Sequence, residues 1–83
     1  MRRKLVLDYS VSEYLCQLRK PQCLQVSRLL KVMADTSSIA SSVTTRDDTG
    51  RVIHHQTIGH WRISYWEDAP VNELRILDIR RDS

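Results

Sequence analysis

The sequence is poor in the residues that define several classes of protein. Its 83 residues include two Gly and two Pro, too few for a collagen-like, low-complexity or linker sequence. Its apolar runs are only a few residues long, so it contains neither a candidate membrane span nor the apolar core of a signal peptide. We therefore expect a cytoplasmic protein that does not bind a membrane.

Cysteine is scarce as well. Cys16 and Cys23 form no CxxC pair, and no paired histidines stand at the spacing of a zinc finger. Two such cysteines in a cytoplasmic protein are typically free thiols buried on helices. The sequence also lacks a His-x-Glu-x-x-His helix and any convergent set of carboxylates, so we expect no metal and no cofactor.

The composition is that of one globular domain. A chain of 83 residues is long enough for a single domain over residues 1–83, with a small core. Hydrophobic residues make up 41% and charged residues 28%, which is typical of a folded rather than a disordered chain. The formal net charge of +3 permits an anionic partner but does not require one.

The first part of the sequence predicts a strand followed by a helix. Arg3–Tyr9 alternates between two faces, as a half-buried strand does. Ser10–Glu13 has the form of a capping box, in which the Ser and Glu side chains bond to each other's backbone N–H groups at a helix start. A helical stripe accompanies it, formed by Val11, Tyr14, Leu15 and Leu18.

A proline separates this helix from a second one. At Lys20-Pro21 the residue before proline avoids helical dihedrals, whereas proline itself fits the first turn of a helix. We expect two amphipathic helices in a hairpin with a very short connection. Asp35–Thr45 is rich in Ser and Thr and predicts a loop or a weak strand. The apolar face of the second helix consists of Cys23, Val26, Leu29, Leu30 and Met33.

The second half predicts three strands separated by turns. Turn residues cluster at 47–50, 59–60 and 68–70, and the strand-like runs lie at 51–58, 61–67 and 73–80. The predicted order is β-α-α-β-β-β. Such an order gives an α+β domain, with the two-helix hairpin packed on one face of a small, mixed and mainly antiparallel sheet.

Alternation assigns faces within the last two runs. In the middle run, one face is apolar and aromatic and holds Trp61, Ile63 and Tyr65. The opposite face of that run holds Arg62, Ser64 and Trp66. In the last run, Leu74 and Ile76 share one face and Leu77 and Ile79 the other, as expected of a central strand that is apolar on both sides.

Two motifs in this half resemble a known family. Residues 59–68 are GHWRISYWED, a glycine followed by an aromatic-Arg-Ile-x-Tyr run and an acidic turn. Residues 75–81 are RILDIRR, a final strand of the form Ile-Leu-x-Ile with arginine directly after it. Together with the order of elements, these motifs resemble the RelE/ParE toxin superfamily over nearly the whole chain. The resemblance implies that family's α+β fold and a type II toxin.

The chain departs from the family pattern at two points. A Gly-His or Gly-Lys pair usually separates the last strand from its arginine, whereas Ile79 is followed directly by Arg80. The sequence ends at Ser83 without the C-terminal tyrosine or histidine that several ribonucleolytic members use. Both departures concern catalysis and leave the expected fold unchanged.

The resemblance implies metal-independent RNA cleavage, which aligns the 2′-OH with the adjacent phosphate, stabilises the developing charge and transfers two protons. Arginine suits the phosphate because its planar guanidinium donates two parallel, charged hydrogen bonds. Arg62 matches the motif arginine, and Arg80 or Arg81 matches the arginine after the last strand. His54 or His55 is the candidate proton carrier. Adjacent strand residues point to opposite faces, so only one histidine shares the face of Arg62.

Further residues are candidates for binding nucleic acid. Trp66 shares a face with Arg62, where it would stack on an unpaired base or be covered by an antitoxin segment or by residues 36–45. Basic side chains would contact RNA phosphates, although a charge-rich helix face is usually only solvated. These basic candidates are Arg51, Lys20, Arg28 and Lys31.

Three functions are compatible with the sequence. The leading expectation is a toxin that inhibits translation by cleaving mRNA on the ribosome. A cognate antitoxin would neutralise this toxin by covering its basic face. The second is a non-catalytic inhibitor that binds DNA gyrase, as in the ParE branch. The third is a small binding protein that keeps the scaffold and has no toxicity.

Overall fold

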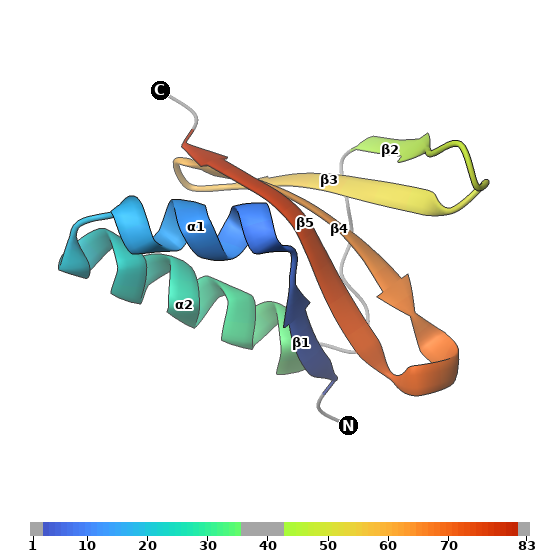
Figure 1. The fold of residues 1–83 in the computed structure, drawn as a ribbon, viewed down its shortest axis with the longest axis horizontal. Coiled ribbons are helices and arrows are strands. Elements are labelled where there is room, and N and C mark those ends of the chain that lie inside the picture. The colour runs from blue at the N-terminus through green and yellow to red at the C-terminus, as the bar shows by residue number, and fades with distance from the viewer. Residues whose placement is uncertain (1–2, 36–42, 82–83) are drawn as a thin grey trace.

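The structure, a computed structural model, describes residues 3–35 and 43–81. The two helices lie side by side on one face of a curved sheet (Figure 1). This arrangement confirms the expected α+β class and the helical hairpin. In chain order the elements are β1 (Lys4–Leu7), α1 (Tyr9–Gln17), α2 (Lys20–Asp35), β2 (Val43–Arg46), β3 (Val52–Ile58), β4 (Trp61–Asp68), the short 3₁₀ helix η1 (Ala69–Val71) and β5 (Glu73–Arg81).

The sheet is mixed and mainly antiparallel, as predicted. Its strand order is β1-β5-β4-β3-β2, with β1 parallel to β5 and the other neighbours antiparallel. β5 is therefore an internal strand. The described residues include one strand more than the predicted order, because β2 forms in the segment expected to be a loop or a weak strand. Residues 36–42 of that segment lie outside the described residues.

The first helix begins earlier than the capping box predicts. α1 starts at Tyr9, its N-cap is Asp8, and no side chain caps it. The backbone N–H of Ser12 already donates to the carbonyl oxygen of Asp8 at 3.1 Å. The capping-box prediction at Ser10–Glu13 is therefore wrong, because Ser10 lies within the first turn instead of before it.

The connection between the helices follows the prediction, whereas the cysteines do not. α2 begins at Lys20 with Pro21 in its first turn. Both cysteines are free, but Cys16 is exposed and Cys23 is only half-buried. The prediction of buried thiols is wrong because Cys16 points away from the α1 stripe that contains the buried Val11.

The core lies between the helices and the sheet. Burial of a large apolar side chain in such a core stabilises the fold by roughly 1.5–3 kcal/mol. The assignment of Trp61, Ile63 and Tyr65 to the core is confirmed. The ten clustered side chains are Val11, Val26, Leu30, Met33, Trp61, Ile63, Tyr65, Leu74, Ile76 and Ile79.

A bulge in β5 overturns one predicted face. On β4, Ser64 pairs with Asp78 while the next residue pairs with Ile76, so Leu77 is an extra residue in β5. An extra residue reverses the alternation of side chains beyond it. Ile79 therefore joins Ile76 in the core, and the prediction that Ile79 shares the opposite face with Leu77 is wrong.

Arg3, which precedes β1, forms hydrogen bonds to the end of α2 and to β4. Its side chain is 9% exposed. Its guanidinium donates to the carbonyl oxygen of Met33 and to Oε1 of Glu67, each at 2.6 Å. Its backbone N–H donates to the carbonyl oxygen of Ala34 at 3.0 Å. The last carbonyls of a helix have no partner within the helix, so Arg3 satisfies the end of α2.

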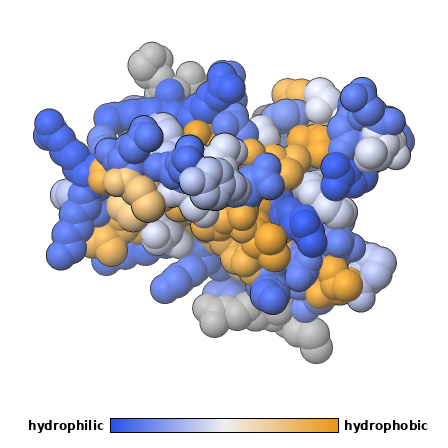
Figure 2. Space-filling model, viewed as in Figure 1, coloured by the Kyte–Doolittle hydropathy of each residue, from blue (hydrophilic) through white to orange (hydrophobic). Residues whose placement is uncertain are grey.

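The surface is mainly hydrophilic in the view of Figure 2, with a hydrophobic area near its centre and smaller ones toward its left and right. Among residues 3–35 and 43–81, no helix has both the length and the apolar character needed to cross a membrane. The large hydrophobic side chains that are exposed come from several elements, as is common on protein surfaces. They are Tyr9, Leu24, Val32, Val43, Val52 and Val71.

Candidate functional site

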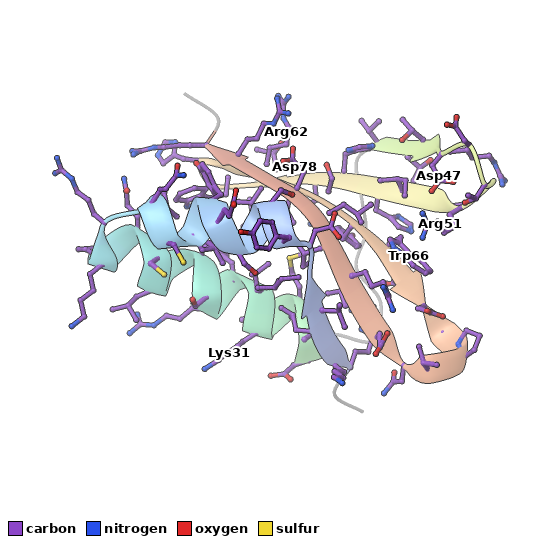
Figure 3. All side chains as sticks on the ribbon, in the orientation of Figure 1. Lys31, Asp47, Arg51, Arg62, Trp66 and Asp78 are labelled. Atoms are coloured by element: carbon purple, nitrogen blue, oxygen red, sulfur yellow. The ribbon has the colours of Figure 1, made fainter. Side chains whose placement is uncertain are left out.

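The candidate site lies on the open face, the side of the sheet that the helices leave uncovered. Between β3 and β4, His55 pairs with Ser64 and Thr57 pairs with Arg62. Paired residues on neighbouring strands project to the same side, so these four side chains share one face. That face is opposite the buried Ile63, and Figure 3 shows Arg62 projecting from it.

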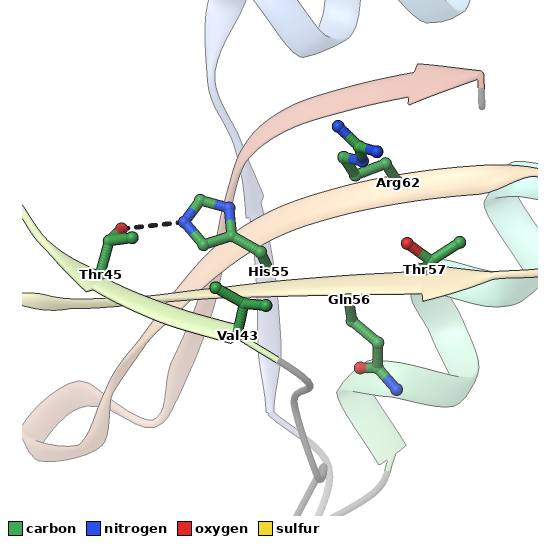
Figure 4. Close-up of a pocket in the computed structure, with 6 residues that line it drawn as sticks. All are labelled: Val43, Thr45, His55, Gln56, Thr57 and Arg62. Carbon is green, nitrogen blue, oxygen red and sulfur yellow. Dashed lines mark hydrogen bonds between the residues drawn. The ribbon is translucent and has the colours of Figure 1, made fainter.

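His55 and Arg62 line one hollow of about 390 Å³ on this face. In Figure 4 their side chains lie on the same side of the β3 and β4 ribbons, while Gln56 projects to the other side. The hollow lies where β2 meets β3, so three strands contribute to it. Its lining residues are Val43, Thr45, His55, Gln56, Thr57 and Arg62.

The imidazole of His55 is held at both nitrogens by hydroxyl groups. Nδ1 lies 2.8 Å from Oγ of Ser64, and Nε2 lies 2.9 Å from Oγ1 of Thr45. The tertiary structure thus selects between the two adjacent histidines, because His55 is the one that shares the face of Arg62.

His54 faces the helix side of the sheet instead. Its ring stacks on that of the buried Tyr65, with centroids 5.2 Å apart and planes inclined by 16°. The Tyr65 hydroxyl donates to Oε1 of Gln56 at 3.4 Å. Burial raises the pKa of Tyr65, and the negative charge of Glu67 raises it further, while Arg3 opposes the change. His54 therefore belongs to the packing of this side and lies away from Arg62.

The register also separates the two C-terminal arginines. Arg62 pairs with Arg80, and Trp61 pairs with Arg81. Arg80 consequently shares the open face with Arg62, whereas Arg81 projects to the side of the buried Trp61. The Nε of Arg80 donates to Oδ2 of Asp78 at 2.9 Å, and the Arg80 side chain is 75% exposed.

Trp66, the candidate for base stacking, is flanked by two arginines of the same chain. The guanidinium of Arg51 lies 4.6 Å from the centroid of the Trp66 ring, and that of Arg75 lies 5.5 Å from it. Both distances are within the range of cation–π contacts. A base reaching this position would meet the arginine planes together with the indole.

Carboxylates neutralise much of the positive charge on the open face. Arg51 bonds to Asp47 at 2.8 Å, and Arg75 bonds to Glu73 at 3.1 Å. The hydroxyl of Thr49 contributes most to lowering the pKa of Asp47 to about 2, and Arg51 lowers it further. The face therefore combines both signs of charge.

The predicted basic residues do not form a single surface. Trp66 and Arg51 lie on the open face, whereas Lys20, Arg28 and Lys31 are exposed on α2. Figure 3 shows Lys31 projecting away from the side that carries Arg62. None of these five residues lines the hollow that contains His55 and Arg62.

Sequence reasoning did not identify Thr45, Ser64 and Asp78 as parts of the site. Alternation puts Ser64 on the face of Arg62, but its contact with His55 depends on the pairing of β3 with β4. Thr45 lies in the segment predicted as loop or weak strand, and Asp78 is placed by the β5 bulge. In the two described ranges, no group of three His, Cys, Asp or Glu residues is arranged to hold a metal.

Comparisons with known proteins identify the fold. No protein-family model matches the sequence, and no curated protein matches it significantly. A chain in the crystal structure of the archaeal RelE–RelB complex from Pyrococcus horikoshii OT3 superimposes with a TM-score of 0.74. The match covers 100% of this chain and 98% of that chain, at 11% sequence identity. This likeness shows a RelE-like fold, which is the fold that the sequence motifs imply.

Proposed function

We propose that this chain is the toxin of a type II toxin–antitoxin pair and cleaves mRNA at the ribosome without a metal ion. The observation that carries the proposal is the grouping of His55, Arg62 and Arg80 on the open face. A proton carrier and permanent cations are groups that promote phosphodiester cleavage, because they transfer a proton and stabilise the charge on the phosphate. The similar chain comes from a complex of RelE with RelB, which supports an antitoxin as the partner.

The pairing of Arg62 with Arg80 supports an anionic ligand. Like charges directly opposite each other on neighbouring strands destabilise a sheet. Asp78 offsets part of this repulsion through its bond to Arg80. A phosphate group that accepted charged, bidentate hydrogen bonds from these guanidinium groups would reduce the repulsion further.

The chemistry follows from these positions. The 2′-oxygen of RNA attacks the adjacent phosphorus and loses its proton toward His55, while the two arginines stabilise the charge on the phosphate oxygens. The bond from phosphorus to the 5′-oxygen breaks, and that oxygen takes up a proton from water. The products are a 2′,3′-cyclic phosphate and a free 5′-OH.

Induced expression tests this proposal. We expect the wild-type chain to arrest growth and to create new 5′ ends in an abundant mRNA, detected by primer extension. Arg62→Ala should lose both effects while remaining soluble. Arg19→Ala is the matched control, because Arg19 is an exposed arginine between α1 and α2 and lies outside the hollow. Normal growth with soluble wild-type protein contradicts the toxin proposal.

The mixed charge of the open face favours a second candidate, a non-catalytic inhibitor that binds DNA gyrase. Three arginines on or beside this face, Arg51, Arg75 and Arg80, bond to carboxylates, an arrangement that suits a protein surface better than a continuous phosphate track. Under this alternative, induction damages DNA and leaves mRNA intact. Arg62→Ala would then leave the mRNA profile unchanged from wild type.

A further inference from the structure

His55 bridges three strands through hydrogen bonds at both ring nitrogens. Ser64 on β4 meets Nδ1 at 2.8 Å, and Thr45 on β2 meets Nε2 at 2.9 Å. We propose that Ser64 orients the imidazole and that the Thr45 hydroxyl relays the proton between the substrate and Nε2. This inference deepens the proposed ribonuclease function and rests on it.

The geometry assigns the two hydroxyl groups different roles. Thr45 lines the hollow together with His55 and Arg62, whereas Ser64 is not among the lining residues and is half-buried. A ring nitrogen makes one hydrogen bond in the plane of the ring, and at Nε2 the Thr45 hydroxyl already occupies that direction. A 2′-OH in the hollow therefore reaches the Thr45 oxygen before it reaches the ring.

A hydroxyl is suited to such a relay because it donates one hydrogen bond and accepts others. The proton of the 2′-OH passes to Oγ1 of Thr45 while the Thr45 proton passes to Nε2 of His55. The 2′-oxygen forms its bond to phosphorus as the bond to the 5′-oxygen breaks, and the 5′-oxygen takes its proton from water. Thr45 is unchanged at the end of the step, and His55 has become an imidazolium.

The relay sets a requirement on the resting protein. Nε2 must carry a lone pair to accept the Thr45 proton, so the neutral ring carries its proton on Nδ1. Oγ of Ser64 then accepts the hydrogen bond from Nδ1, and it continues to do so when the ring becomes an imidazolium. His55 thus gains and releases a proton without movement of its heavy atoms.

Nuclear magnetic resonance of the free protein tests the resting state without any activity. The ¹⁵N shifts of the two His55 ring nitrogens identify the protonated one in the neutral form. We expect the proton on Nδ1 in the wild type and a shift toward Nε2 in Ser64→Ala. Ser64→Thr keeps a hydroxyl and should retain the wild-type pattern. A neutral wild-type ring protonated at Nε2 overturns the relay.

Cleavage kinetics test the relay itself, with the full chain and ribosomes carrying a defined mRNA. We expect Thr45→Val to lower the single-turnover rate by at least about 10-fold, part of the ~100- to 10,000-fold that a proton-transferring group contributes. The half-saturating concentration should stay unchanged because the arginines still bind the phosphate. Thr45→Ser should restore most of the rate.

Thr44→Val is the matched control, because Thr44 lies next to Thr45 on β2 and pairs with His54. Equal cleavage by the Thr44→Val and Thr45→Val proteins overturns the relay and leaves the ribonuclease proposal intact. A wild-type protein that cuts no ribosome-bound mRNA overturns the proposed function and the relay together. Loss of cleavage in Thr45→Val with recovery in Thr45→Ser supports both.

Discussion

The two sides of the sheet use neighbouring residues for different purposes. On the helix side, β4 contributes Ile63 and Tyr65 to a closed apolar core. On the open side, the adjacent Arg62 and Ser64 lie among hydroxyl, imidazole and charged groups. A strand that alternates in this way provides stability from one face and leaves the other free for chemistry.

The ion pairs on the two sides of the sheet differ in how far their side chains are exposed. Arg3 is 9% exposed, bonds to Glu67 and also satisfies the end of α2. The Arg80–Asp78 pair on the open side has partners that are 75% and 46% exposed. Exposed pairs contribute about 0–1 kcal/mol, whereas a buried cation that bonds to the backbone contributes more. Open-face variants should therefore alter function with little effect on folding.

The largest difference is expected between two adjacent residues of β4. Ile63→Ala should lower the free energy of unfolding by about 2–5 kcal/mol, because Ile63 is 0% exposed and its truncation leaves a cavity. Ser64→Ala should lower it by about 1 kcal/mol or less. Urea denaturation measures both values. Equal losses would contradict the division of the sheet into two functional sides.

Arginine-to-methionine substitutions compare the ion pairs directly. Arg3→Met should lower the free energy of unfolding by about 2 kcal/mol, because it leaves the carbonyl oxygen of Met33 and the carboxylate of Glu67 without this donor. Arg75→Met on the open side should cost about 1 kcal/mol or less, since the Arg75 side chain is 43% exposed. A larger loss for Arg75→Met than for Arg3→Met in thermal or urea unfolding would reverse the comparison.

The adjacent C-terminal arginines sharpen the comparison for function. Under the proposed ribonuclease function, Arg80→Ala should slow RNA cleavage by about 10-fold. This is less than the roughly 100- to 1,000-fold typical of a lost preorganised donor, because Arg62 remains. Arg81→Ala should leave the rate close to that of the wild type, since Arg81 projects to the other side. Both proteins should unfold at similar urea concentrations. A greater effect of Arg81→Ala would contradict the assignment of the site to the open face.

The smallest effect is expected on the helix side at alkaline pH. The pKa of Tyr65 is raised above its usual 10.0, mainly by burial. A raised pKa means that the folded state favours the neutral phenol. The contribution of Tyr65 to the free energy of unfolding is therefore fully present below pH 10.0 and is lost as the pH rises through the higher folded-state pKa. Between pH 10.0 and the folded-state pKa, the free energy of unfolding should thus fall less steeply in Tyr65→Phe than in the wild type. Tyr9→Phe, altered at a 78% exposed side chain, should behave like the wild type.

Much of the fold followed from local patterns. The two helical stripes, the proline between them and the turn residues predicted the helices and the last three strands, because these signals act over a few residues. The capping box failed because the backbone of Asp8 already accepted the first helical bonds. The face of Ile79 was mispredicted because a bulge depends on the partner strand, which a local pattern does not include.

Local sequence patterns predicted only part of the candidate site. Alternation and the motif selected Arg62, but His54 remained equivalent to His55 and Arg81 to Arg80. Thr45 carried no signal, because the side chain that it contacts comes from another strand.

The sequence alone determined which residues of β4 face the core, since apolar side chains must leave water together. Tertiary structure decided which open-face residues meet. The register between β3 and β4 brings His55 to Ser64, and the register between β4 and β5 brings Arg62 to Arg80. Register is set by long-range strand pairing and by bulges, so it emerges only when the whole sheet is assembled.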